Sequence, residues 1–340
     1  MHMINALVSP VVGGTMLAVT AGVGGYCVKK LEMEQMEKKL PLMGVMGAFV
    51  FGTQMLNFAI PGTGASGHLC GGILLAAVLG PYAGFLTMAT ILLVQALFFG
   101  DGGLLAFGAN LFNMGFVSCF VAYPLIFKPL MKREQGFDSK KIGLVALLAS
   151  IVALQLGAFG VVIETAFSGK TAIPFVGFVA RMQPIHLAIG IVEGCITGAV
   201  LNLVYKTTPH FMSQVYETVQ SKAKRSKYGW LGLWLVIILV TAGALSHLAS
   251  SNPDGLEWSI SKVIGTQELM QGQTSQLHEV VQNLQESIVI LPDYHFKQGT
   301  FNSWASGTTV AGIIGSGLTF GMIMLIGRLI ANISKRTAFK

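Results

Sequence analysis

The stretch PGTGASGHLCGGILLAAVLGPYAGFLTMATILLVQALFFG, from Pro61 to Gly100, contains no charged residue. It begins as a glycine-rich loop that carries a single imidazole, His68, and continues as two apolar runs separated at Gly80-Pro81. A Gly-Pro pair of this kind ends one helix and begins the next. Because apolar runs approaching about 20 residues are typical of helices that span a bilayer, the stretch predicts helices inside a membrane.

The whole chain has this character, with 53% hydrophobic and only 11% charged residues among its 340. Soluble domains carry about 25% charged residues, so the composition indicates an all-α integral membrane protein. The apolar runs predict a bundle of about seven transmembrane helices, with two more in a second module. The predicted segments are about 6–28, 41–60, 68–80, 83–99, 105–127, 142–167 and 184–206, then 229–249 and 309–332.

The segment 68–80 is short for a crossing, because about 13 residues of helix extend for only roughly 20 Å. We therefore expect the loop before it to dip into the membrane. Irregular backbone at that depth is tolerated only where protein or a water-filled cavity satisfies its polar groups. The loop that carries His68 is for this reason a candidate site.

Basic residues follow the pattern of cytoplasmic loops rather than that of a surface for nucleic acid. Most of the 22 Lys and Arg residues lie in four short segments beside apolar runs, at 29–39, 128–141, 206–227 and 328–340. The positive-inside rule places such segments in the cytoplasm. We expect a multi-pass protein of the prokaryotic cell (inner) membrane, in contact with lipid, without nucleic acid, and with an extracytoplasmic N-terminus. Positive charge does not precede the first apolar run, as a secretory signal would require, so we expect Met1 to remain the first residue.

The same charge pattern divides the chain into a membrane domain at 1–210, a cytoplasmic linker at 211–227 and an accessory module at 228–340. The module has two predicted transmembrane helices and an extracytoplasmic segment at 250–308. Within that segment, apolar residues at helical spacing predict an amphipathic helix whose apolar face packs against the protein. These residues are Leu277, Val280, Val281, Leu284 and Ile288.

Two histidines, His2 and His68, fall on the outer side in this topology. The amine of Met1, the amide nitrogen of His2 and its Nδ1 can chelate one ion through fused five- and six-membered rings, and His68 would add a fourth nitrogen. Planar nitrogen coordination suits Ni(II) or Cu(II). An initial Met-His pair is also common by chance, so the residues alone leave open that no metal binds.

Ionisable and amide side chains inside or beside the spans are further candidates, because such groups are costly in a membrane. They could support the metal ligands from a second layer. Mutual hydrogen bonds that hold the bundle together are an equal alternative for each. The candidates are Asp101, Asn110, Glu164, His186 and Glu193.

Enzyme motifs are missing from the sequence. Ser168-Gly169-Lys170-Thr171 ends like a P-loop, but that pattern requires Gly where the chain has Glu164. The HExxH motif of metalloproteases and a paired-Asp arrangement are absent. We therefore expect no ATPase within this chain; that it is a transporter subunit follows only from its resemblance to a known family. A secondary transporter driven by an ion gradient stays an alternative, although such proteins use paired broken helices in inverted repeats.

Several motifs together resemble the substrate-capture component of nickel/cobalt importers of the energy-coupling-factor class. They are the opening Met1-His2-Met3, PGTGASGHLCGG, LGPYAG, LFFGDGGLLAFGANLFNM, and His186 to Gly190 with Glu193-Gly194. Pro253-Asp254-Gly255-Leu256-Glu257-Trp258 resembles the small accessory component of the nickel members, here fused to the same chain.

The resemblance implies that residues 1–210 capture Ni(II), or Co(II), as transported substrate, held by Met1, His2 and His68. It implies a transmembrane coupling (T) subunit and cytoplasmic ATPase subunits as partners. The accessory part favours nickel, and its segment 250–308 is expected to lie above His68. Asn5 stands where many members have an acidic residue, and we expect it to hydrogen-bond near the metal.

Overall fold

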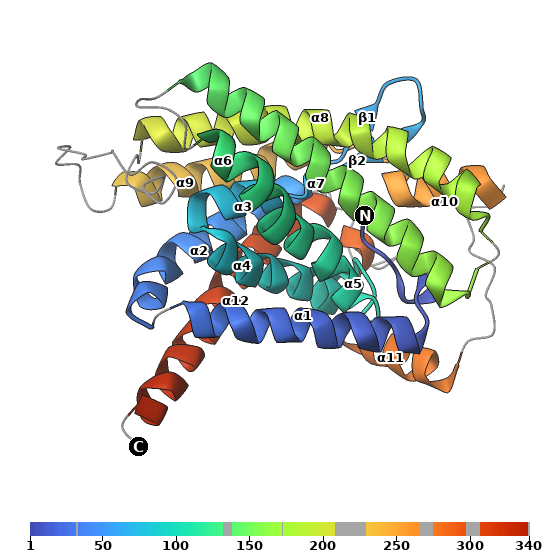
Figure 1. Cartoon of the computed structure of the whole chain (residues 1–340), viewed down its shortest axis with the longest axis horizontal. Coiled ribbons are helices and arrows are strands. Elements are labelled where there is room, and N and C mark those ends of the chain that lie inside the picture. Colours follow the sequence, from blue (N-terminus) through green and yellow to red (C-terminus); the bar gives the residue numbers. More distant parts are fainter. Residues whose placement is uncertain are drawn as a thin grey trace.

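The computed structural model describes residues 1–31, 33–131, 138–171, 173–207, 229–264, 275–296 and 307–338. Most of these residues are helical, and the helices at 10–30 and 175–207 run along opposite sides of the molecule (Figure 1). The predicted linker at 211–227 lies outside the described residues.

The elements follow the predicted order closely. The helices of the membrane domain are η1 (Asn5–Leu7), α1 (Pro10–Lys30), α2 (Met33–Gln54), α3 (Gly72–Leu79), α4 (Pro81–Val94), the π-helix η2 (Gln95–Phe99), α5 (Phe107–Leu111), the π-helix η3 (Phe112–Phe127), α6 (Lys128–Met131), α7 (Ser139–Ser168) and α8 (Phe175–Thr207). The accessory module contains α9 (Gly229–Leu239), η5 (Val240–Ala244), η6 (Leu245–Leu248), α10 (Gly255–Ile264), α11 (Gln276–Ile288), η7 (Pro292–Tyr294) and α12 (Gly307–Ala338).

Within the described residues, six helices are long and apolar enough to cross a membrane. This confirms the predicted class of an all-α integral membrane protein. The six are Pro10–Lys30, Pro81–Phe99, Phe107–Met131, Ser139–Ser168, Phe175–Thr207 and Gly307–Asn332. That the segments in α2, in α3 and from α9 to η6 also cross stays a prediction.

The helix α3 is the short helix that the sequence predicted, and it is buried along its whole length. Its 8 residues extend for about 12 Å, less than half of a hydrocarbon core of about 30 Å. Gly71 precedes it and Gly80 follows it, both with positive φ, and Pro81 begins α4. The predicted break at Gly80-Pro81 is therefore confirmed.

The loop before α3 contains a small antiparallel hairpin that the sequence analysis treated as irregular. Strand β1 (Phe58–Ile60) pairs with β2 (Ala65–Gly67), which ends directly before His68. Gly62 and Gly64 in the turn have φ of 75°, a conformation that favours glycine. The hairpin gives the backbone of this loop internal hydrogen bonds, which a loop at membrane depth requires.

The orientation of α11 differs from the prediction. The helix forms, but Leu277, Val280 and Leu284 are exposed, while the polar residues His278 and Gln285 are buried. The polar face points inward because Gln285 satisfies the backbone of the adjacent loop: its amide nitrogen donates to the Ala96 and Gly102 carbonyls at 3.0 and 2.8 Å. The need to pair buried carbonyl groups outweighs burial of the apolar stripe.

Helices α7 and α8 pack along each other, as Figure 1 shows at one edge of the molecule. Three glycines of α8 spaced by four residues allow this close approach. A Cβ at Gly194 would lie 2.5 Å from the Leu147 Cα, and one at Gly198 would lie 2.9 Å from the Gly143 Cα.

Gly194→Ala is expected to lower the free energy of unfolding by about 1–3 kcal/mol, because the helix backbones must move apart. Gly22→Ala in α1 is the matched control, since a Cβ there meets nothing within 4 Å. Thermal unfolding of the full chain in detergent measures both. Equal melting temperatures for the two variants would contradict this account of the α7–α8 contact.

Candidate metal site

The amino terminus lies inside the protein. Met1 and His2 are each only 7% exposed, and Met3 is fully buried. First residues are normally mobile unless something ties them down. Here the amide of Asn110 pairs with both backbone groups of Met3: Met3 N donates to Oδ1 at 2.7 Å, and Nδ2 donates to the Met3 carbonyl at 3.1 Å.

The FGDGG turn, residues 99–103, packs against the buried first residues of the chain. The Gly103 amide donates to the Met3 carbonyl at 2.9 Å, and a Cβ at Gly103 would lie 2.4 Å from the Asn5 backbone nitrogen. Gly102 has φ of 83°. Glycine is needed at 102 and 103 because the turn lies close to the N-terminal residues. This close approach places Asp101 beside His2.

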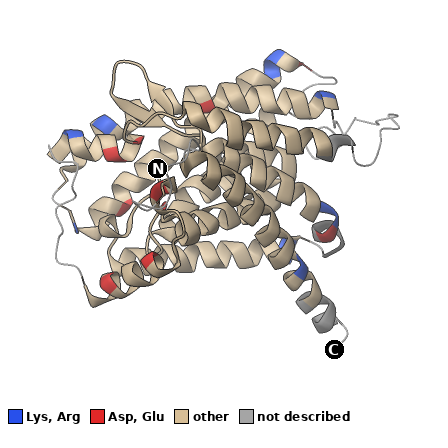
Figure 2. Ribbon diagram, turned by 180° about the vertical axis from the view of Figure 1, so that it is seen from behind, with Lys and Arg blue, Asp and Glu red and all other residues tan. Residues whose placement is uncertain are grey.

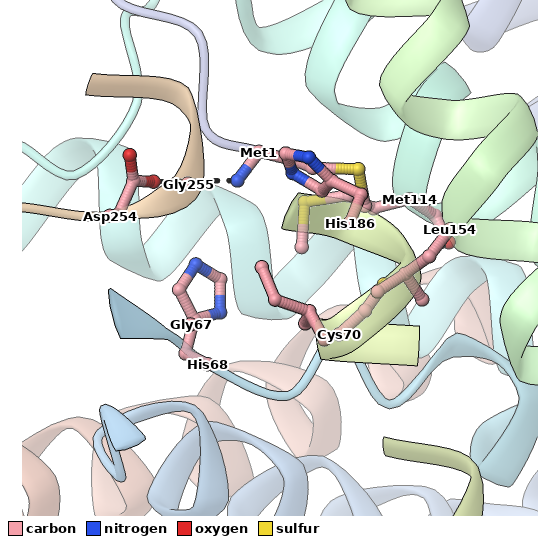
Figure 3. Close-up of a pocket in the computed structure, with 10 residues that line it drawn as sticks. Met1, Gly67, His68, Cys70, Met114, Leu154, His186, Asp254 and Gly255 are labelled. Atoms are coloured by element: carbon pink, nitrogen blue, oxygen red, sulfur yellow. Dashed lines mark hydrogen bonds and ion pairs between the residues drawn. The ribbon is translucent and has the colours of Figure 1, made fainter. Parts of the chain in front are cut away.

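His2 and His68 come together although they are far apart in sequence. Their ring centroids are 5.0 Å apart and their planes are inclined by 24°. The two rings are stacked, and a ring nitrogen directs its lone pair in the plane of its ring, so one of the rings would have to turn for both to bind the same ion. Figure 3 shows the His68 ring pointing toward the part of the pocket that holds the Met1 amine.

The hydrogen bond of His68 determines which of its two ring nitrogens can bind a metal ion. Its Nδ1 lies 3.1 Å from the Leu69 carbonyl, which can only accept, so Nδ1 carries the proton in the neutral ring and Nε2 keeps its lone pair. Metal-bound histidines commonly donate their other N–H to a carbonyl in this way.

Both rings are held in the neutral form that binds metals. Burial, followed by the charge of the amino terminus, lowers the pKa of His2 to about 3. Burial, the amino terminus and His2 lower the pKa of His68 to about 4. Neutral imidazole is the ligating form, so neither ring has to lose a proton to bind an ion near pH 7.

The accessory module contributes a carboxylate to the same place. Asp254 Oδ2 lies 3.5 Å from the Met1 amine, and Figure 3 marks this contact. Burial alone would raise the pKa of Asp254, but the amino-terminal ammonium and a backbone hydrogen bond from Glu257 lower it to about 2. The first and second parts of the chain therefore meet at the amine.

Asp101 lies on the other side of His2. Its Oδ1 is 3.4 Å from His2 Nδ1, and its Oδ2 accepts a hydrogen bond from the Tyr294 hydroxyl. Burial raises the pKa of Asp101, with partial relief from His68 and from the Tyr294 hydrogen bond. A cavity of about 470 Å³ adjoins this group and is lined by His2, Asp101, Asp254, Glu257 and Asp293, among others.

His186 and Glu193, both from α8, approach the loop that carries His68. Glu193 accepts hydrogen bonds from the amides of Cys70 at 2.7 Å and Gly71 at 3.1 Å. His186 lines a cavity of about 10 Å³ together with Met1 and His68. Its Nδ1 lies 2.8 Å from the Met182 carbonyl, and its Nε2 has no partner within the described part of the chain.

Two other candidates lie outside this group. Asn5 donates to the side-chain oxygens of Gln282 and Gln285 in α11 and accepts from the Leu105 amide. It therefore joins the N-terminal segment to the accessory module. Glu164 in α7 accepts a hydrogen bond from Asn113 at 2.6 Å. None of the hydrogen bonds of Glu164 described here joins it to Met1, His2 or His68.

The sequence analysis missed Gln54 and Gln95 and did not place Asp254 or Tyr294 at the site. Both glutamines are buried, and Gln95 lies 3.2 Å from His2. A signal was available, because amide side chains within apolar runs are as unusual as the ionisable residues that were selected. In the described residues, no three His, Cys, Asp or Glu side chains form a metal cluster.

The lowered pKa values predict acid sensitivity of the metal-free protein. As pH falls from 6.5 toward about 4, His68 takes up a proton in the unfolded chain but not in the folded one. Stability present above pH 6.5 is therefore lost as the pH approaches the folded pKa. The gap in melting temperature between neutral pH and about pH 5 should shrink in His68→Gln. It should be unchanged in His247→Gln, an exposed control; an unchanged gap in His68→Gln would contradict the burial argument.

Two family models match the chain. The model described as "Cobalt uptake substrate-specific transmembrane region" (CbiM) matches residues 2–211, and that of the PDGLE domain matches residues 229–332.

Known proteins resemble the chain over most of its length. It is 31% identical to the "Probable fused nickel transport protein LarMN" of Lactiplantibacillus plantarum, with 96% of each chain covered. It is 29% identical to the "Fused nickel transport protein NikMN" of Rhodobacter capsulatus, over 72% of this chain and 73% of that one. A crystal structure of a transition metal transporter is 31% identical, with a TM-score of 0.54 over 64% of this chain and 99% of that one.

Proposed function

Since the chain belongs to the CbiM family of membrane components for nickel and cobalt uptake and carries a PDGLE domain, we propose that it captures Ni(II), or Co(II), through its own first residues. The resemblance inferred from the motifs is confirmed, and the chain is a transport protein rather than an enzyme. The capture chemistry, the orientation and the partner subunits given below are our proposal.

The observation that carries the proposal is the buried amino terminus beside His68. Met1 and His2 are almost fully covered, and the two imidazole rings are 5.0 Å apart. Burying a charged amine is costly unless it has a partner. Here the partner is Asp254, 3.5 Å away, and the amine would give up its proton and this contact when it binds an ion.

The donor set favours a planar ion. The Met1 amine, the His2 amide nitrogen after loss of its proton, and His2 Nδ1 would occupy three corners of a square, with His68 Nε2 at the fourth. Four planar nitrogens suit Ni(II). The names of the two fused relatives also favour nickel over cobalt, whereas the family description names cobalt.

The accessory module would order the loop that carries His68. Ser66 donates from its amide to the Pro253 carbonyl at 2.8 Å and from its hydroxyl to the Asn252 carbonyl at 2.8 Å. The Trp258 indole donates to the Thr63 carbonyl at 2.9 Å. Through these contacts the PDGLE region would control access to the ion.

Transport would need other subunits. The family implies a transmembrane coupling (T) subunit and cytoplasmic ATPase subunits, which would drive release of the ion into the cell. Figure 2 shows Asp and Glu gathered toward the end of the molecule that holds the N-terminus, whereas Lys and Arg lie at both ends; the proposal of an extracytoplasmic site rests on the basic segments at 29–39 and 128–141 of the sequence. Withdrawing ATP while a proton gradient is kept should stop uptake; continued uptake would favour the alternative, a gradient-driven secondary transporter.

The N-terminus tests the ligand set directly. One extra residue would make His2 the third residue, and the terminal segment could then supply four nitrogens by itself. An extension of three residues, Gly-Ser-Gly, avoids this. It should weaken Ni(II) binding by at least about 100-fold, because it removes the amine from the chelate.

The control for this experiment carries the same three residues at the C-terminus, and it should bind Ni(II) like the unmodified chain. His68→Ala should also lose affinity while the bundle stays folded, which thermal unfolding verifies. Isothermal titration in detergent measures each affinity. Normal Ni(II) binding by the N-terminally extended protein would refute the proposed coordination.

A further inference from the structure

A line of three buried hydrogen bonds joins the loop that carries His68 to the His2 ring. The Gln54 amide nitrogen donates to the Cys70 carbonyl at 2.9 Å. The Gln95 amide nitrogen donates to Gln54 Oε1 at 2.7 Å. At the end of the line, Gln95 Oε1 lies 3.2 Å from His2 Nε2.

The direction of every bond in this line is fixed by its first member. A backbone carbonyl can only accept, so Gln54 must present its NH₂ group to Cys70 and its oxygen to Gln95. Gln95 must then present its NH₂ group to Gln54 and its oxygen to His2. An amide oxygen can only accept, so His2 Nε2 must carry the hydrogen.

We propose that Gln54 and Gln95 are positioning residues that hold His2 in the tautomer with a proton on Nε2 and a free lone pair on Nδ1. This inference rests on the proposed function, in which Nδ1 is the ligand that closes the six-membered chelate ring. With the opposite tautomer, the nitrogen facing the ion would carry a hydrogen and could not bind.

These three hydrogen bonds, from Cys70 through Gln54 and Gln95 to His2, form a relay. The relay is needed because Asp101 favours a proton on His2 Nδ1 instead. Its Oδ1 lies 3.4 Å from His2 Nδ1 and would attract a hydrogen there. That distance exceeds the usual 2.7–3.2 Å of an N–H···O bond, whereas the His2–Gln95 contact at 3.2 Å falls within it. The lone pair of Nδ1 and the Asp101 carboxylate together leave a place suited to a cation.

Both ends of the relay are anchored. Cys70 is fixed from its other side by Glu193, which accepts its amide hydrogen. Gln95 begins the π-helix η2, and its own carbonyl accepts from the Asp101 amide at 3.2 Å. A π turn within a helix commonly re-aims a side chain at a functional site. Gln95 is fully buried and Gln54 nearly so, so water does not compete for these bonds.

The experiment uses the full chain in detergent with ¹⁵N-labelled histidine. In the metal-free protein, the nitrogen shifts of His2 should identify a protonated Nε2 and an unprotonated Nδ1. Gln95→Leu should move the proton toward Nδ1 and weaken Ni(II) binding about 10- to 100-fold, the usual effect of removing a partner of a metal ligand. Gln95→Glu keeps an acceptor oxygen toward His2 but loses the donor to Gln54, so it should keep the tautomer.

Controls separate this role from general packing. Gln155→Leu removes another amide within a span, one that bonds to the Gln183 carbonyl, and should change neither tautomer nor affinity. If Gln95→Leu does not fold, Gln54→Leu breaks the relay one step earlier and should shift the tautomer in the same direction. A wild-type His2 protonated on Nδ1 would overturn the proposal, and so would a tautomer and an affinity that the relay variants leave unchanged.

The outcomes also distinguish this proposal from the proposed function. If the N-terminal extension abolishes binding while Gln95→Leu has no effect, the relay fails and the ligand set stands. If His2 has the expected tautomer but the extension leaves binding intact, the relay stands and the ligand set fails.

Discussion

The structure depends on packing residues 1–3 inside a helical bundle. Asn110 pairs with both backbone groups of Met3, and Gly103 adds a third hydrogen bond, so the first residues are fixed among the helices. The FGDGG turn, the buried polar face of α11 and the contact between Met1 and Asp254 surround these residues. These groups pair the polar atoms of a segment that a membrane interior would otherwise exclude.

Both modules contribute side chains that contact the first residues of the chain. The membrane domain supplies His2, His68 and the glutamines that join His2 to the Cys70 carbonyl. The accessory part contacts the amine through Asp254 and the hairpin before His68 through Asn252 and Trp258. Tyr294 holds Asp101 in the same way from the accessory side. Fusion in one chain keeps these partners at high local concentration, which favours contacts that are individually weak.

Sequence patterns predicted the helical membrane class and the break at Gly80-Pro81, because length, hydropathy and Gly-Pro signals act locally. Which face of α11 is buried could not be predicted from its apolar stripe, because the answer depends on the Ala96 and Gly102 carbonyls, which are distant in sequence. Gln54 and Gln95 each stand out in the sequence as one polar residue in an apolar run, but their alignment with His2 depends on the fold. The proximity of His2 to His68 was inferred from the family motifs, not from any periodicity.

The central claim is that four nitrogens in one plane, including the chain's own first nitrogen, hold the transported ion. The most direct measurement is the absorption spectrum and magnetic moment of the nickel-loaded full chain with an unmodified N-terminus. The account predicts diamagnetic, low-spin Ni(II) with the absorption band of planar nitrogen coordination. Paramagnetic, six-coordinate Ni(II) with oxygen ligands would contradict it.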